Sequence, residues 1–150
     1  MTTKNEKRYF PIKTKTACVA KWSFSKIALQ MGTTSSCHRV ISQKFDIEAF
    51  NFHNTLEKIE QRETMLAGEW PDGNPDLAIE TTCKQYCGKF EKNGGFSDRQ
   101  FMNSIPNMYP DELDDDPTLT QVDPTILEVY IDNTCNLKCV YCSPELSSGI

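Results

Sequence analysis

Three cysteines near residue 140 have a spacing suited to an iron–sulfur cluster. Cys135, Cys139 and Cys142 form a C-x3-C-x2-C pattern within eight residues. Three thiolates can hold one side of a 4Fe–4S cube, so one of its four irons is left without a protein ligand. An open metal position is typical of catalytic sites, whereas structural sites fill every position. The spacing therefore predicts a reactive cluster, with a zinc site or inert buried thiols as the alternatives.

This run resembles the defining motif of the radical S-adenosylmethionine superfamily, in which an aromatic residue, here Tyr141, often precedes the last cysteine. The resemblance implies that Cys135, Cys139 and Cys142 ligate a 4Fe–4S cluster whose open iron binds S-adenosylmethionine, with Tyr141 near the adenine. It also implies reductive cleavage of that cofactor to a 5′-deoxyadenosyl radical, which abstracts hydrogen from a substrate. The expected partner is an external reductant such as a flavodoxin or a ferredoxin.

A second set of cysteines lies earlier in the chain. Cys18 and Cys37 fit C-x13-G-x4-C, which resembles the opening of SPASM and twitch domains, and Cys83 and Cys87 follow as C-x3-C. Residues four apart share a helix face. The resemblance implies an auxiliary 4Fe–4S cluster on these four thiols, in a domain of the shorter twitch type. Two features depart from the family: it usually has C-x2-C in place of C-x3-C, and its auxiliary domain usually follows the catalytic motif. A zinc knuckle or a buried helix face remains open as an alternative.

The composition restricts the cellular compartments in which the protein is expected to function. Seven cysteines cannot all pair with one another, and the polar start MTTKNEKRYFP is unlike a secretory signal. The longest apolar stretch is too short to cross a bilayer. These features predict a cytoplasmic protein without a membrane segment, in a reducing compartment where clustered cysteines bind metal. The net charge of −5 argues against tight, non-specific binding of nucleic acid.

The elements expected to position the first cysteines are a strand and a helix. Residues 17–29 have an imperfect apolar alternation that indicates a strand, and residues 33–36 are expected to be a loop. A helix is predicted from an N-cap at Asn54 to about Ala67, with Gly68 ending it. Along one side of it lie Leu56, Ile59, Glu63 and Leu66, so its expected stripe is only partly apolar.

A second helix is predicted from Asn74 and Pro75 to about residue 92, ending at the glycines 94–95. Its face would present Ile79, Cys83, Cys87 and Phe90. The neighbours Asp98 and Arg99 are expected to form a local ion pair of low energy. Both tryptophans are predicted to be core residues, and each histidine is predicted to be a packing or surface residue.

The second half contains an acidic run and a strand. Five acids lie between Pro110 and Pro117, which predicts a solvated linker because like charges repel one another. Residues 126–132, ILEVYID, indicate a mostly buried strand leading into the last cysteine group.

The expected fold class is an α+β N-terminal domain, a β-hairpin plus helices, followed by the first strand of a truncated (β/α)6 partial barrel. The expected division of the chain is 1–8 as a disordered tail, 9–109 as the twitch-like domain, 110–124 as the acidic linker and 125–150 as the start of the barrel. The chain is expected to be the N-terminal part of a longer enzyme, inactive by itself, because the strands and the Gly-rich stretch of the family are missing after residue 150. Its substrate is unknown, with a peptide as one option.

Two other functions fit the same residues. Both clusters could serve a non-enzymatic electron-transfer module, or zinc could stabilise a binding module. Metal analysis after anaerobic reconstitution distinguishes the zinc alternative.

Overall fold

The computed structural model describes residues 6–40, 42–71 and 83–131. The predictions for Ile79 and for the ligand set Cys135, Cys139 and Cys142, with Tyr141, lie outside the described residues.

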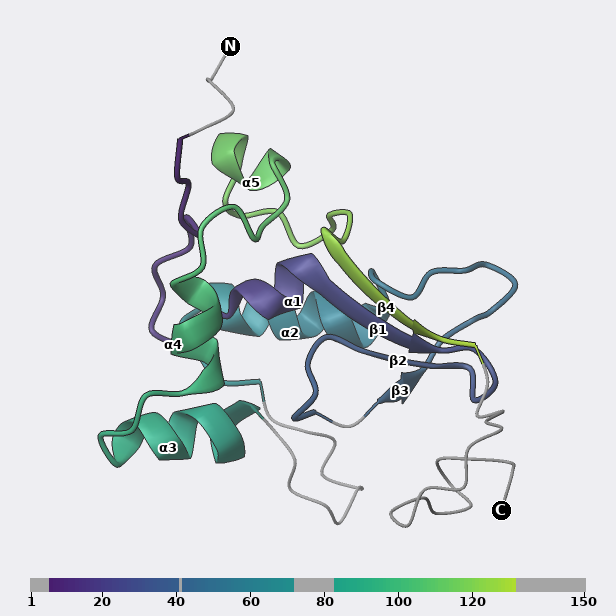
Figure 1. The fold of residues 1–150 in the computed structure, drawn as a ribbon, viewed down its shortest axis with the longest axis horizontal. Coiled ribbons are helices and arrows are strands. Elements are labelled where there is room, and N and C mark those ends of the chain that lie inside the picture. Colours follow the sequence, from purple (N-terminus) through teal and green to yellow (C-terminus); the bar gives the residue numbers. More distant parts are fainter. Residues whose placement is uncertain (1–5, 41, 72–82, 132–150) are drawn as a thin grey trace, which may run out of the picture.

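The described residues form an α+β fold around a four-stranded mixed sheet, which confirms the predicted class (Figure 1). The sheet order is β3-β2-β1-β4, with β1 at Phe24–Ala28, β2 at Thr33–Ser35, β3 at Gln43–Lys44 and β4 at Ile126–Tyr130. Strands β1 and β2 form an antiparallel hairpin, whereas β4 pairs with β1 in parallel. The register of the parallel pair runs from Phe24 opposite Ile126 to Ala28 opposite Tyr130.

The predicted strand at 17–29 is wrong in its first half. Helix α1 occupies Val19–Ser23 and is followed at once by β1. Val19 and Trp22 are three residues apart and lie in the core together, which is helical spacing rather than alternation. The loop prediction for 33–36 is also wrong, because β2 occupies most of it and its threonines suit a strand.

Helix α2, at Leu56–Leu66, begins one residue later than predicted. Its N-cap is Thr55, whose side chain accepts a hydrogen bond from the backbone N–H of Lys58, and Gly68 ends it with φ of +79° as predicted.

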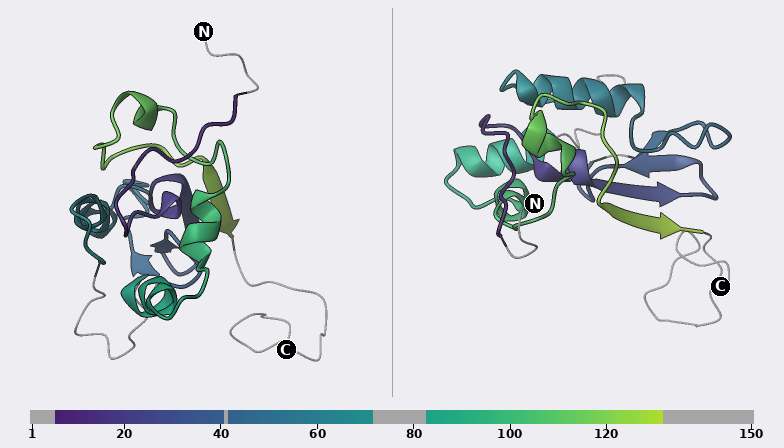
Figure 2. Two further views of the ribbon diagram at one scale, coloured as in Figure 1. Left: turned by 90° about the vertical axis from the view of Figure 1, so that its left-hand side faces the viewer. Right: turned by 90° about the horizontal axis from the view of Figure 1, so that it is seen from above.

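The predicted apolar stripe of α2 is wrong. The helix buries Lys58, Arg62 and Met65, while Leu56 is 69% exposed. Figure 2 shows α2 packed over α1 and one face of the sheet. There the hydroxyl of Ser25 accepts a hydrogen bond from Lys58, and the carbonyl of Lys21 accepts one from Arg62. The periodicity of apolar residues therefore predicted the wrong buried face for α2.

The described part of the second predicted helix consists of a π-helical segment η1, Lys84–Gly88, and α3, Lys89–Lys92. It ends before Gly94, whose φ is +81°, as predicted. Helix α4, Asp98–Asn103, follows with a capping box between Ser97 and Gln100.

The acidic run contains a short helix α5, Glu112–Asp115. Its acidic side chains are exposed, as predicted, but Leu113 is fully buried and Val122 is in the same core. Arg8, which the sequence assigns to a disordered tail, forms ion pairs with Asp111 and Asp114. This core consists of Phe10, Ile12, Ala17, Val19, Trp22, Met65, Tyr109, Leu113 and Val122. The run is therefore attached to the core rather than detached from it.

Strand β4 exists as predicted, but its predicted burial is wrong in the described part. It is the edge strand of the sheet, and Leu127, Val129 and Tyr130 are 45–49% exposed (Figure 2). Among the described residues, no helix combines the length and the apolar character needed to cross a membrane.

A cavity lined by four cysteines

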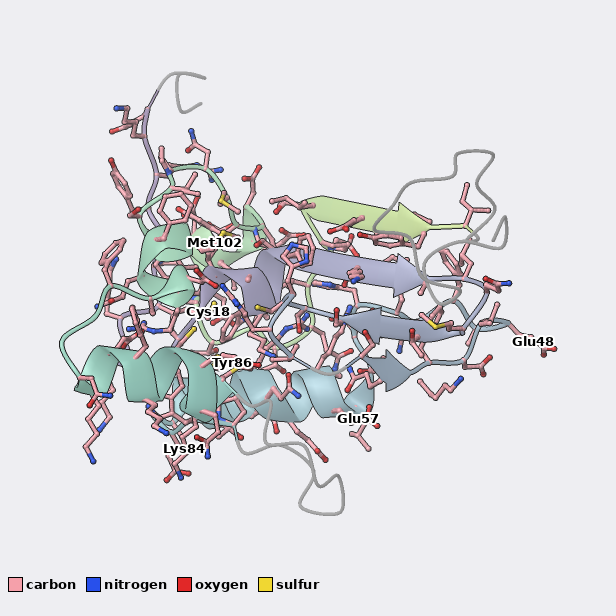
Figure 3. The ribbon with its side chains drawn as sticks, turned by 60° about the horizontal axis from the view of Figure 1, so that its bottom comes forward. Cys18, Glu48, Glu57, Lys84, Tyr86 and Met102 are labelled. Carbon is pink, nitrogen blue, oxygen red and sulfur yellow. The ribbon has the colours of Figure 1, made fainter. Side chains whose placement is uncertain are left out.

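The four N-terminal cysteines line one cavity. Cys18, Cys37, Cys83 and Cys87 all belong to the wall of a cavity of about 310 Å³. The structure therefore brings the four predicted ligands to the wall of one cavity, and their role as metal ligands stays a prediction. In Figure 3, Cys18 lies between Met102 and Tyr86, which belong to the same wall and come from α4 and η1.

Each cysteine is placed by a different local feature. Cys18 is the extended N-cap residue of α1, and Cys37 follows the end of β2 by two residues. Cys83 is the N-cap residue of η1, and Cys87 lies within η1. A π-helical turn has more residues than an α-helical one, so residues four apart remain close to one face. The segment after β2, the start of α1 and the helical segment with Cys83 and Cys87 therefore meet at the cavity.

The remaining wall is largely apolar. Its apolar members are Ala20, Phe24, Val40, Met65, Trp70, Tyr86, Phe101 and Met102. Trp70 is half-buried against this cavity, so the prediction that it is a core residue is wrong, whereas Trp22 is fully buried as predicted. A Cβ at Gly88 would lie 2.9 Å from Cε2 of Trp70, and the absence of a side chain at Gly88 is what allows the indole to approach η1.

The four thiols are free, and burial makes three of them weaker acids. None of the four forms a disulfide. Burial raises the pKa of Cys18 to about 12 and also raises the pKa values of Cys37 and Cys87. These three thiols are therefore protonated at neutral pH in the metal-free protein, and a metal must displace the protons.

Backbone N–H groups act against burial at three of the four sulfurs. The N–H of Arg39 donates to Sγ of Cys37 at 3.4 Å, and the backbone at Ala20 and Arg99 acts to lower the pKa of Cys18 and Cys87. These donors favour the thiolate form and therefore oppose the effect of burial.

Charged side chains surround the cavity. Lys21 is 2% exposed on its wall, and its Nζ donates to Oε1 of Gln61 at 2.6 Å. The local Asp98–Arg99 pair predicted from the sequence is wrong: Arg99 binds Glu91 and Asp98 binds Arg39. Lys21 was missed as a site residue because its segment was expected to be a strand. Residues three apart lie on the same side of a helix, so Lys21 lies on the same side of α1 as Cys18.

The two histidines have different surroundings. His53 is 3% exposed, and its Nδ1 lies 2.7 Å from Oγ of Ser25, so it is a packing residue, as predicted. Burial is the main cause that lowers the pKa of His53 to about 3, and the nearby cation of Arg62 acts in the same direction. His38 lies on the cavity wall with an exposed side chain, 3.8 Å from Oε2 of Glu128.

Four thiols are a donor set that zinc and iron–sulfur clusters both use. Among the residues that the structure describes, no three His, Cys, Asp or Glu side chains are grouped closely enough for a single metal ion. The four thiols line the wall of one cavity, and the N–H of Arg39 donates to Sγ of Cys37.

Cys135, Cys139, Cys142 and Tyr141, the second predicted set, lie outside the described residues. In comparisons with protein-family models, curated proteins and solved structures, nothing matches this chain.

Proposed function

We propose that this chain contains the N-terminal part of a radical S-adenosylmethionine enzyme, in which the four-cysteine cavity holds an auxiliary 4Fe–4S cluster. The observation that carries the auxiliary site is the convergence of Cys18, Cys37, Cys83 and Cys87 on one cavity. The catalytic part of the proposal rests on the C-x3-C-x2-C run and Tyr141.

The residues of the cavity have separate roles in this proposal. The four thiols are the ligands, and each loses its proton when the metal binds. The N–H groups of Ala20, Arg39 and Arg99 then stabilise the thiolates. Apolar side chains limit the access of water to the centre, which affects its redox potential. When bound, the cluster supplies one-electron redox chemistry.

In the second set, Cys135, Cys139 and Cys142 would bind the reactive cluster and leave one iron for S-adenosylmethionine. Tyr141 would contact the adenine. The electron would come from a flavodoxin or a ferredoxin, and the substrate class includes peptides. A cytoplasmic location agrees with the free state of the four described thiols.

Anaerobic reconstitution with iron and sulfide tests both sites. The unchanged chain should bind two clusters, about eight irons, because each cubane holds four. Replacing Cys18, Cys37, Cys83 and Cys87 together by Ala should halve that number, and so should replacing Cys135, Cys139 and Cys142. A variant without either set is the matched control and should bind no cluster.

Electron paramagnetic resonance then tests whether one iron of the second cluster is open to S-adenosylmethionine. S-adenosylmethionine should change the signal of the reduced protein when Cys135, Cys139 and Cys142 are present, and should leave it unchanged when they are replaced. Zinc in place of iron and sulfide would contradict the proposal in favour of a zinc-stabilised module. Two clusters that never respond to S-adenosylmethionine would favour an electron-transfer module.

A further inference from the structure

Helices α1 and α2 bury three basic side chains side by side. Lys21, Lys58 and Arg62 are 2%, 1% and 0% exposed. Within the described ranges, none of the three is paired with a carboxylate. Buried cations are normally paired, because removing a charge from water is unfavourable unless an opposite charge replaces the solvent.

Neutral oxygen atoms hold the two deeper cations. Nζ of Lys58 donates to Ser25, Thr34 and the carbonyl of Phe52 at 2.7–2.9 Å. Arg62 donates through Nε to the carbonyl of Lys21 at 2.7 Å. These bonds satisfy the donors but leave the positive charge uncompensated. Burial is the main cause that lowers the pKa of Lys58 to about 7, and the charges of Arg62 and Lys21 act in the same direction.

Lys21 is the member of this trio on the wall of the cysteine cavity. Its side chain shares that wall with Cys18 and Cys37, and its charge acts to lower the pKa of both against the larger effect of burial. Arg39 and Arg99 are also on the wall, but each has a carboxylate partner. Among the described residues, Lys21 therefore has no carboxylate partner for the positive charge that it places beside the thiols.

Four thiolates around an iron–sulfur core make a centre with net negative charge, which becomes more negative on reduction. Resting on the function proposed above, we propose that Lys21, held by Gln61 and supported by Arg62, is the internal counter-ion of the four-cysteine centre and raises its reduction potential. The positive charge favours the reduced state more than the oxidised state, because the reduced state has one more negative charge.

A redox titration monitored by electron paramagnetic resonance tests this in the variant that lacks Cys135, Cys139 and Cys142, so that only one cluster contributes. Lys21→Met removes the charge and keeps a long side chain. We expect it to shift the equilibrium at least tenfold towards the oxidised cluster, which is a potential lower by about 59 mV for one electron. Lys21→Arg keeps the charge and should restore most of the potential.

Two further variants separate charge from structure. Gln61→Glu leaves Lys21 in place but puts a carboxylate next to its Nζ, so we expect a lower potential as well. Lys44→Met, at an exposed lysine on β3 that binds the carbonyl of Met31, is the control and should leave the potential unchanged. Iron and sulfide content are measured for every variant.

The outcomes are distinct. A retained cluster with an unchanged potential in Lys21→Met and Gln61→Glu overturns the counter-ion role and leaves the proposed function standing. If Lys21→Met does not fold, Gln61→Glu decides alone. No cluster in the parent variant, or zinc in its place, overturns the proposed function and this inference with it.

Discussion

Nη2 of Arg99 and Oε2 of Glu91 lie 2.7 Å apart, in an ion pair whose side chains are only 10% and 16% exposed. Nη1 of Arg99 also donates to the carbonyl of Ala17 at 2.9 Å, directly before Cys18. Glu91 belongs to α3, which continues from the segment with Cys83 and Cys87. One guanidinium therefore fixes two walls of the cavity relative to each other.

Removing one partner of this pair should destabilise the fold strongly. We expect Glu91→Gln to reduce the free energy of unfolding by about 3 kcal/mol, because Arg99 is left buried without its counter-charge. Urea denaturation of the metal-free chain measures it. Asp98→Asn is the control, since the Asp98–Arg39 pair is more than half exposed and should contribute at most about 1 kcal/mol. Equal losses in the two variants would contradict the role of Glu91.

His53 should make the protein less stable in mild acid. Its pKa is about 3 in the folded state and about 6.5 in the unfolded chain, so between these values only the unfolded chain binds the proton. Stability is therefore intact above about pH 6.5 and falls as the pH decreases, by about 1–2 kcal/mol at pH 5. Urea titrations at both pH values measure the slope. His53→Gln should flatten it, while the exposed His38→Asn should leave it unchanged.

Lys58 should make the stability of the folded protein depend on pH above neutrality. Its pKa is about 7 in the folded state and about 10.4 in the unfolded chain, so between these values the unfolded chain binds more protons. Stability therefore rises with pH above 7, by about 1–2 kcal/mol at pH 8.5 in the metal-free protein. Lys58→Met should remove this rise, as measured by urea denaturation at the two pH values. A rise that persists in Lys58→Met would exclude Lys58 as its source.

The thiol of Cys18 should react slowly in the metal-free folded protein. Burial raises its pKa to about 12, and only the thiolate reacts with iodoacetamide. At pH 8 we expect alkylation of Cys18 to be at least about a hundredfold slower than in urea, where its pKa returns to about 8.5. Mass spectrometry of the peptide containing Cys18 follows the rate. Similar rates in the two conditions would show that the thiol is not buried.

Replacing Gly88 by Ala should disturb the cavity wall. Alanine is the better helix former by about 1 kcal/mol, yet its Cβ would lie 2.9–3.3 Å from three atoms of the Trp70 ring. We expect a net loss of stability of about 1–2 kcal/mol and a shift in tryptophan emission. Lys92→Ala, an exposed change in the same helical run, should alter neither. Unchanged emission in Gly88→Ala would contradict this contact.

The grouping of the four cysteines on one site was predicted from the resemblance of the C-x13-G-x4-C pattern to SPASM and twitch domains, and the structure places all four on one cavity wall. The predicted cap at Asn54 and the glycine at Gly68 marked the ends of α2 within one residue. The buried face of α2 could not be predicted, since Lys58 and Arg62 are buried only because distant hydroxyl and carbonyl groups accept their hydrogen bonds.

Local sequence patterns did not predict the long-range pairing of strands either. Residues 126–130 have the composition of a buried strand, but only the pairing with β1 decides that β4 is an exposed edge. Helix α1 was missed because five residues are too few to establish a periodicity, and its position is set by Trp22 in the core.

Helix α1 passes into β1 with no connecting residue between Ser23 and Phe24. Strand side chains alternate between faces, so adding or deleting one residue here would move Ser25 and Ile27 to the wrong face and shift β1 against β4. The distance along the chain from Cys18 to the end of β1 is therefore fixed. We expect length variation to be tolerated in the exposed segment after β3, around residue 47, but not between the first cysteine and Ala28.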